Sequence, residues 1–93
     1  MSEDYKMTSS YTRAVKAQLE SVRDSPDGVV RSNLMTAAKK HAKSLWPAYH
    51  VGQGVWIKVL KDLIRDGSLE EESGTYHLSQ DGLRTLAIAD SYC

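Results

Sequence analysis

The chain has 93 residues, of which 41% are hydrophobic and 26% are charged. This length supports one domain with a single core and excludes two. No apolar run approaches the roughly 20 residues that cross a bilayer, and the N-terminus lacks the apolar segment of a secretory signal. Cys93 is the only cysteine, which excludes an intrachain disulfide and a cysteine metal cluster. We expect a soluble, intracellular protein with no membrane partner and an incidental terminal thiol.

The net charge of zero is unevenly distributed along the chain. The segment from Arg31 to Arg65 contains seven basic residues and one acid, Asp62, so it carries a net charge of +6 and the remainder carries −6. The neutral total argues against an indiscriminate coat on nucleic acid. A basic surface on a neutral body nevertheless attracts a polyanion locally.

The first elements are a tail and a helix. Residues 1–8 are polar and without periodicity, which predicts a flexible tail ahead of a single domain over residues 9–93. A hydroxyl side chain between Thr8 and Ser10 can cap a first helix, which ends near Asp24. The apolar stripe of this predicted helix is Tyr11, Ala14, Val15, Leu19 and Val22.

A turn and a second helix follow. Proline and glycine bracket an aspartate in residues 25–28, which is a strong turn signal, and Val29-Val30 can then add an edge to a small sheet. Ser32 or Asn33 can cap a second helix that ends before Pro47. The apolar stripe of this helix is predicted to be Leu34, Ala37, Ala38, His41 and Leu45.

The segment from Gln53 to Gly67 has the clearest helical pattern. One side of the predicted helix carries Trp56, Val59, Leu60, Leu63 and Ile64. The opposite side carries Gly54, Lys58, Lys61 and Arg65. Gly67 follows Asp66 at the position where a helix commonly ends in a glycine. The pattern predicts a helix with one face in the core and a cationic face in solvent.

A hairpin and a last helix complete the chain. Residues 69–72 and 75–78 flank the two-residue loop Ser73-Gly74, which predicts a β-hairpin. Ser79 is expected to cap a last helix from Gln80 to about Asp90. The side chains expected to face inward are Tyr76 and Leu78 in the hairpin and Leu83, Leu86 and Ala87 in the helix.

The predicted order of elements is helix, short strand, helix, helix, hairpin, helix. This is the order of a winged helix-turn-helix, an α+β, mainly α fold with a three-helix core, a C-terminal-side hairpin wing and a closing helix. In helix-turn-helix docking the second helix of the motif enters the major groove and the helix before it crosses the phosphate backbone. The segment from Gln53 to Gly67 is therefore the predicted recognition helix.

Basic residues on two predicted helices are the candidate DNA contacts. Cationic side chains along the recognition helix reach phosphate oxygens, whereas residues at its start lie nearest to the base edges. There Gln53 can pair with adenine. The candidate DNA-binding residues are Lys39, Lys40, Lys43, His50, Gln53, Lys58, Lys61 and Arg65. The alternative interpretation is that these lysines solvate two exposed helix faces.

The predicted wing has the opposite charge. Glu70, Glu71 and Glu72 are consecutive acids, and carboxylates beside phosphates repel them. We expect this wing to stay off the duplex or to face a basic protein partner. A protein-interaction winged helix is accordingly the alternative function, with the acidic wing or the exposed Ile57 beside the basic residues as its docking surface.

The histidines and hydroxyls do not form a catalytic or metal-binding pattern. His41 lies on an apolar stripe, His50 in a loop and His77 in a strand, and no pair has the spacing of metal ligands on one helix. The serines lack a recognisable base and orienting acid. We expect neither an enzyme nor a cofactor.

Three spaced motifs carry a family resemblance. They are Leu34-x-x-Ala37-x-x-x-His41-Ala42-x-x-Leu45, then Trp56 with Leu60-x-x-Leu63-Ile64-x-x-Gly67-x-Leu69, then Tyr76-x-Leu78-Ser79-x-x-Gly82-x-x-x-Leu86-Ala87. Over about residues 11–89 the chain resembles the winged-helix domain of the Mus-type crossover-junction endonucleases, relatives of the XPF nucleases. The resemblance implies a nuclear domain that binds duplex or branched DNA and guides a nuclease in DNA repair and recombination. The nuclease signature of that family is absent, so the resemblance implies a module without catalysis.

Overall fold

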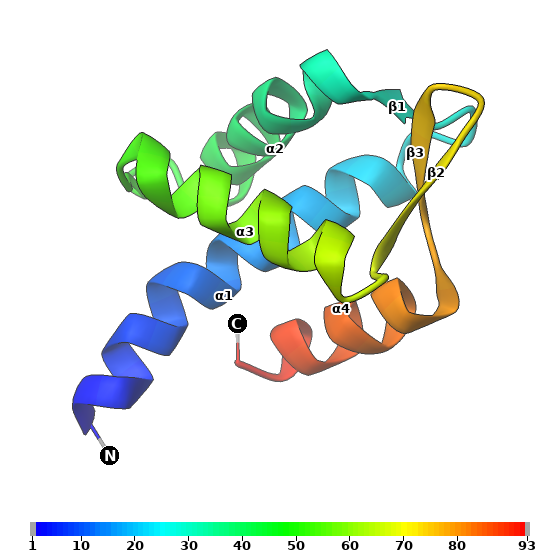
Figure 1. Ribbon diagram of the computed structural model, residues 1–93. Helices are drawn as coiled ribbons and strands as arrows, with labels where there is room; N and C mark the ends of the chain where they lie inside the picture. Colours follow the sequence, from blue (N-terminus) through cyan, green and yellow to red (C-terminus); the bar gives the residue numbers. More distant parts are fainter. Residues whose placement is uncertain (1, 93) are drawn as a thin grey trace.

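The structure, a computed structural model, describes residues 2–92 and the side chains of residues 10–92 (Figure 1). Within this range the chain forms four helices and one three-stranded antiparallel sheet, which confirms the predicted α+β, mainly α class. The elements in chain order are α1 (Ser2–Arg23), β1 (Val29–Val30), α2 (Arg31–Leu45), α3 (Gln53–Arg65), β2 (Leu69–Glu72), β3 (Thr75–Leu78) and α4 (Gln80–Tyr92). This order is compatible with a winged helix. The terminal thiol of Cys93 lies outside the described residues.

The first two helices begin earlier than the sequence predicts. The backbone of α1 is helical from Ser2, so the predicted cap between Thr8 and Ser10 is wrong. The segment contains no proline or glycine that would stop a helix there. The predicted caps of α2, Ser32 and Asn33, are wrong as well. The N-cap is Val30, whose side chain makes no capping hydrogen bond, because α2 starts directly after the short strand β1.

The core lies where α1 packs against α2, α3 and α4 (Figure 1). The predicted inner sides of α1 and α3 are largely confirmed, and Trp56 is only 4% exposed. The buried apolar residues of the first three helices are Ala14, Val15, Ala17, Leu19, Val22, Leu34, Ala38, Ala42, Trp56, Val59 and Leu63. The predicted stripe of α2 is wrong at Leu45, which is 39% exposed at the helix end. The cationic side of α3 is thus backed by a continuous core.

The sheet has the order β1-β3-β2, and it confirms both the hairpin and the edge strand. Val29 pairs with Tyr76 between β1 and β3, and Leu69 pairs with Leu78 across the hairpin. Ser73 and Gly74, the two loop residues, have φ angles of 55° and 86°. Positive φ at both positions suits a tight hairpin turn whose twist matches that of the strands. The hairpin follows α3 in the chain and projects from one end of the molecule (Figure 1).

The helix α4 is joined to the base of the hairpin, as the predicted cap requires. The Ser79 hydroxyl accepts a hydrogen bond from the Gly82 amide at 2.9 Å, and the Ser79 amide donates to the Ser68 carbonyl at 3.1 Å. The predicted inner side of α4 is wrong, however, for Leu83, which is 53% exposed, and for Ala87. Leu86 is buried as predicted, and Gly82 and Ala89 are buried with it, because the first turn packs a glycine against the Ser68 backbone.

Candidate nucleic-acid interface

The outer face of α3, defined by Gly54, Lys58, Lys61 and Arg65, is exposed as predicted. The side chains of Lys58 and Arg65 are 67% and 78% exposed. The helix begins at its N-cap Gly52 and ends at Asp66, and Gly67 adopts a φ of 84° beyond it. This positive φ is the conformation that favours glycine after a helix.

One acidic residue, Asp62, lies among the basic residues of α3. The Asp62 carboxylate lies 3.4 Å from the Lys58 ammonium and 2.7 Å from the Arg65 guanidinium, and it accepts a hydrogen bond of 2.5 Å from the Tyr11 hydroxyl. The bond from Tyr11 is the main reason that the pKa of Asp62 is lowered, and Lys58 adds to it. Asp62 therefore stays ionised and offsets part of the charge. Among residues 10–92, Lys61 has no ion pair.

Four of the predicted DNA-binding residues meet at the start of α3. Lys39, Lys43, His50 and Gln53 line a hollow of about 450 Å³, together with the aromatic rings of Tyr49 and Trp56 and neighbouring residues of the loop before α3. The N-cap Gly52 offers no side chain to the first amides of the helix, and a Cβ at Gly52 or Gly54 would meet nothing within 4 Å. Open helix amides beside cationic side chains favour an anion such as phosphate.

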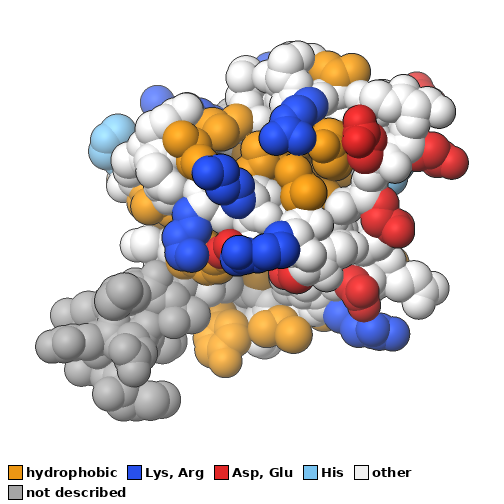
Figure 2. Space-filling model, viewed as in Figure 1, with side chains coloured by type: hydrophobic (Ala, Val, Ile, Leu, Met, Phe, Trp, Pro, Cys, Tyr) orange, Lys and Arg blue, Asp and Glu red, His pale blue; other side chains and the backbone are white. Residues whose placement is uncertain are grey.

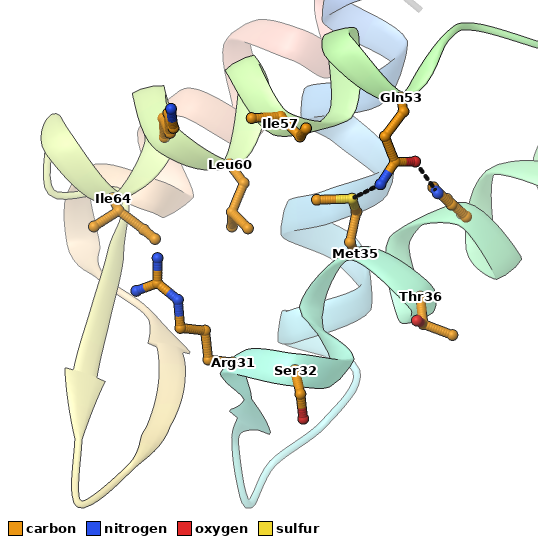
Figure 3. Close-up of a pocket in the computed structure, with 10 residues that line it drawn as sticks. Arg31, Ser32, Met35, Thr36, Gln53, Ile57, Leu60 and Ile64 are labelled. Atoms are coloured by element: carbon orange, nitrogen blue, oxygen red, sulfur yellow. Dashed lines mark hydrogen bonds between the residues drawn. The ribbon is translucent and has the colours of Figure 1, made fainter.

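Gln53, the residue predicted to pair with adenine, already has partners within the chain (Figure 3). The Lys39 ammonium donates to its side-chain oxygen, and its side-chain nitrogen lies 3.2 Å from the Met35 sulfur, to which it donates. Both ends of the amide are thus used. The oxygen keeps a second lone pair and the nitrogen a second N–H, so a contact between Gln53 and a base must either share these groups with Lys39 and Met35 or displace those partners.

Lys40 lies apart from the other candidates. It lines a separate hollow of about 340 Å³, near Asp24, His41 and Ser44. Lys39 and Lys43 share the hollow at the start of α3, which Lys40 does not line. A helix turns by about 100° per residue, so Lys40 points about 100° away from Lys39 and about 60° away from Lys43.

A groove between α2 and α3 was not predicted. It encloses about 690 Å³ and has an apolar floor of Met35, Ile57, Leu60 and Ile64. In Figure 3, Leu60 and Ile64 extend from α3 toward α2. Basic residues at its rim are Arg31, Lys39 and Lys61. Figure 2 shows the same arrangement on the surface, with Lys and Arg side chains around a hydrophobic area.

Arg31 also borders this groove, although it is not among the predicted DNA contacts. Its position follows from the packing of β1 beside β3, because the guanidinium donates a hydrogen bond of 3.0 Å to the Tyr76 hydroxyl. That bond holds the side chain over one end of the groove, near Ile64 (Figure 3). The available signal was its place in the basic segment, directly after the two valines of the predicted edge strand.

The acidic wing is exposed as well. Glu70, Glu71 and Glu72 are all solvent-accessible, and with His77 they border a shallow hollow of about 240 Å³. Figure 2 shows acidic side chains gathered on the hairpin side of the molecule, away from most of the bases. Within the part of the chain that the structure describes, no three His, Cys, Asp or Glu side chains could together hold a metal ion.

A second charged cluster lies between α1, α2 and α4. Burial by itself would raise the pKa of Glu20, but hydrogen bonds from Lys16 and His41, at 2.8 Å and 2.7 Å, outweigh it and lower that pKa. Lys16 also pairs with Asp90 of α4. His41, predicted as a core or boundary residue, is half-buried here. The cluster connects α1, α2 and α4. None of its charged side chains lines the hollow at the start of α3 or the groove between α2 and α3.

The comparisons with known proteins found no match: no protein-family model, no curated protein and no solved structure resembles this chain closely enough to count as one. In the described range, no helix combines the length and the apolar character that crossing a membrane requires.

Proposed function

We propose that this chain is a winged-helix module without catalytic activity that binds double-stranded or branched DNA through its phosphates, with modest sequence selectivity. The observation that carries the proposal is the exposed basic face of α3, which continues through Lys39 and Lys43 into the hollow at the start of that helix. A role beside a structure-specific nuclease, in the nucleus, rests only on the resemblance of the sequence motifs.

The geometry supports a helix-turn-helix mode of docking. If α3 lies in the major groove, α2 crosses the phosphate backbone, and its Lys43 then stands next to the open amides at the start of α3. Lys58, Lys61 and Arg65 run along the other part of the helix, where they can reach phosphates on either side of the groove. Phosphate contacts of this kind fix position and carry little sequence information.

The test is fluorescence anisotropy of labelled linear and branched duplexes across a series of salt concentrations. If about four or five bases contact phosphates, the logarithm of affinity falls against the logarithm of salt with a slope of about −4. The double variant Lys43→Glu/Lys61→Glu should lower affinity by about 100-fold, since each reversal replaces an attraction with a repulsion. Its circular dichroism spectrum should be unchanged, because both side chains are exposed.

The matched control is Lys40→Glu, which makes the same charge change on α2 but outside both hollows that border α3. We expect this variant to lose no more than about threefold in affinity, through the longer-range change in charge. Equal losses in Lys40→Glu and in the single variant Lys61→Glu would show that only net charge matters and would contradict the docking face. Absence of binding at low salt would overturn the function itself.

A protein-interaction module is the second candidate, and the groove between α2 and α3 is the observation that favours it. An apolar floor with a basic rim suits an amphipathic helix that bears acidic residues. Such binding should respond to salt less steeply than phosphate binding does, because its apolar contacts are not screened. A labelled acidic amphipathic peptide that binds the chain, and is released by Ile57→Asp while duplex DNA does not bind at all, would favour this alternative over the proposed function.

A further inference from the structure

The outer side of α3 is not uniformly cationic. Ile57 is 39% exposed, one turn after the start of the helix and between Gln53 and Lys61 on the wall of the groove. Leu60, Ile64 and Met35 continue the apolar surface behind it (Figure 3). An exposed apolar side chain in the first half of a helix that enters the major groove lies at the base edges rather than at the phosphates.

The residues around Ile57 leave it little competition for those base edges. Gln53 is held by Lys39 and by the Met35 sulfur. Gly52 and Gly54 have no side chain to offer, and the open space beside both glycines allows the backbone to approach closely. The side chain that the first turns of α3 present to a base edge is therefore an apolar one.

In the major groove, the C5-methyl group of thymine is the apolar feature of a base edge. Cytosine, adenine and guanine present hydrogen-bond donors and acceptors there, and burying these against Ile57 without a partner is unfavourable. A thymine methyl buried against Ile57 instead leaves water, which favours binding by about fourfold for each methyl group.

We infer that the side of α3 that borders the groove with α2 selects thymine-bearing duplexes. The contacts are those between the thymine C5-methyl groups and Ile57, with Met35 and Leu60 behind it. This inference rests on the proposed DNA-binding function. It names the base that supplies the modest sequence selectivity: thymine is recognised by its methyl group, and no hydrogen bond from Gln53 is required.

The experiment compares two duplexes of identical sequence, one containing thymine and the other deoxyuridine, which differ only in the methyl group. Anisotropy titrations at one salt concentration should show affinity about fourfold to 15-fold lower for the deoxyuridine duplex, for one or two buried methyl groups. A second pair of duplexes tests the addition of a methyl group rather than its removal. A duplex of guanine and cytosine should gain affinity when its cytosines are replaced by 5-methylcytosine, which places a methyl group at the same position of the groove.

The variant Ile57→Ala assigns the preference to its residue. It should lose most of the preference for the thymine duplex over the deoxyuridine duplex, while its salt dependence stays that of the wild type. Ile88→Ala is the matched control, because Ile88 is 61% exposed on α4, away from the groove. It should keep the full preference for thymine.

The outcomes separate the inference from the function on which it depends. Equal affinity of the wild type for the thymine and deoxyuridine duplexes, with normal salt-dependent binding, overturns the inference and leaves DNA binding intact. A preference of undiminished size in Ile57→Ala also overturns it, because the methyl groups then act through the shape of the duplex. No binding to either duplex at low salt overturns the proposed function together with the inference.

Discussion

The outer face of α3 and the β2–β3 hairpin are adjoining exposed surfaces with opposite charge. Lys58, Lys61 and Arg65 project from a helix whose other side is buried through Trp56 and its neighbours. The glutamates of β2 project from a hairpin that is anchored mainly at its base, where Leu69 and Tyr76 are buried. The net charge of zero conceals this division. Charges that cancel in the total are therefore separated on the surface by the elements that carry them.

The largest effect on these two surfaces is expected from a change that displaces the hairpin from α3. A Cβ at residue 82 would lie 2.2 Å from the Ser68 carbonyl oxygen and 2.7 Å from Leu78, so Gly82→Ala must move the first turn of α4 away from the hairpin base. We expect a loss of about 3 kcal/mol in the free energy of unfolding, measured by urea denaturation. Gly54→Ala is the matched control, since a Cβ there meets nothing within 4 Å.

That control should be stabilised, by up to about 1 kcal/mol, because alanine loses less conformational freedom than glycine in a helix. If Gly82→Ala unfolds at the same urea concentration as the wild type, the close packing of α4 on the Ser68 backbone is not what holds the hairpin in place.

The next largest effect is expected when the hairpin loses part of its negative charge. The double variant Glu71→Gln/Glu72→Gln removes two exposed carboxylates from the hairpin and leaves α3 unchanged. Affinity for duplex DNA should rise by about fivefold for each carboxylate that lies close to a phosphate, and the gain should shrink as salt rises. The measurement is the same anisotropy titration. Asp27→Asn removes one exposed carboxylate from the turn before β1 and is the control, with a smaller change expected.

A smaller effect is expected from the one acid on the basic side. Asp62→Asn removes the charge that offsets Lys58 and Arg65, so affinity for DNA should rise by about threefold. Tyr11→Phe is the matched variant, because it removes the hydrogen bond to Asp62 and keeps the carboxylate. It should lower stability and leave DNA affinity unchanged within error.

The same pair has a pH dependence of known sign. The hydrogen bond from Tyr11 lowers the pKa of Asp62 below its ordinary value of 3.8 in the folded chain. The stability that this interaction supplies is therefore present above about pH 4 and is lost as the pH falls through the lowered pKa. Urea midpoints of the wild type and Tyr11→Phe should converge in that acidic range. A constant difference between them at all pH values would contradict the linkage.

Much of the fold could be predicted from the sequence because its local signals agree with the packing. The hairpin is fixed by Ser73-Gly74, the end of α3 by Gly67, and the start of α4 by the Ser79 cap. The inner side of α4 could not be predicted in this way. Hydrophobicity favours Leu83 as an inner residue, but the contact between Gly82 and the Ser68 backbone sets the rotation of the helix, and such a contact leaves no trace in the apolar pattern.

The candidate interface was predictable in part, for a similar reason. The periodicity of α3 identifies its exposed bases, since exposure follows from a single helix. It does not identify partners on other elements. The bond between Gln53 and Lys39 and the groove that includes Met35 both depend on how α2 lies beside α3.

One buried amide bears on how α1 and α2 are aligned. Gln18 is fully buried in α1, and its side-chain nitrogen donates a hydrogen bond of 3.0 Å to the Leu34 carbonyl of α2. Its side-chain oxygen has no hydrogen-bond partner among the described residues. A leucine in this place would pack at any register in which the apolar stripes meet, whereas sliding α1 by one turn would leave the whole amide unpaired. We therefore expect Gln18 to favour one alignment of the two helices, at the cost in stability of its unpaired oxygen.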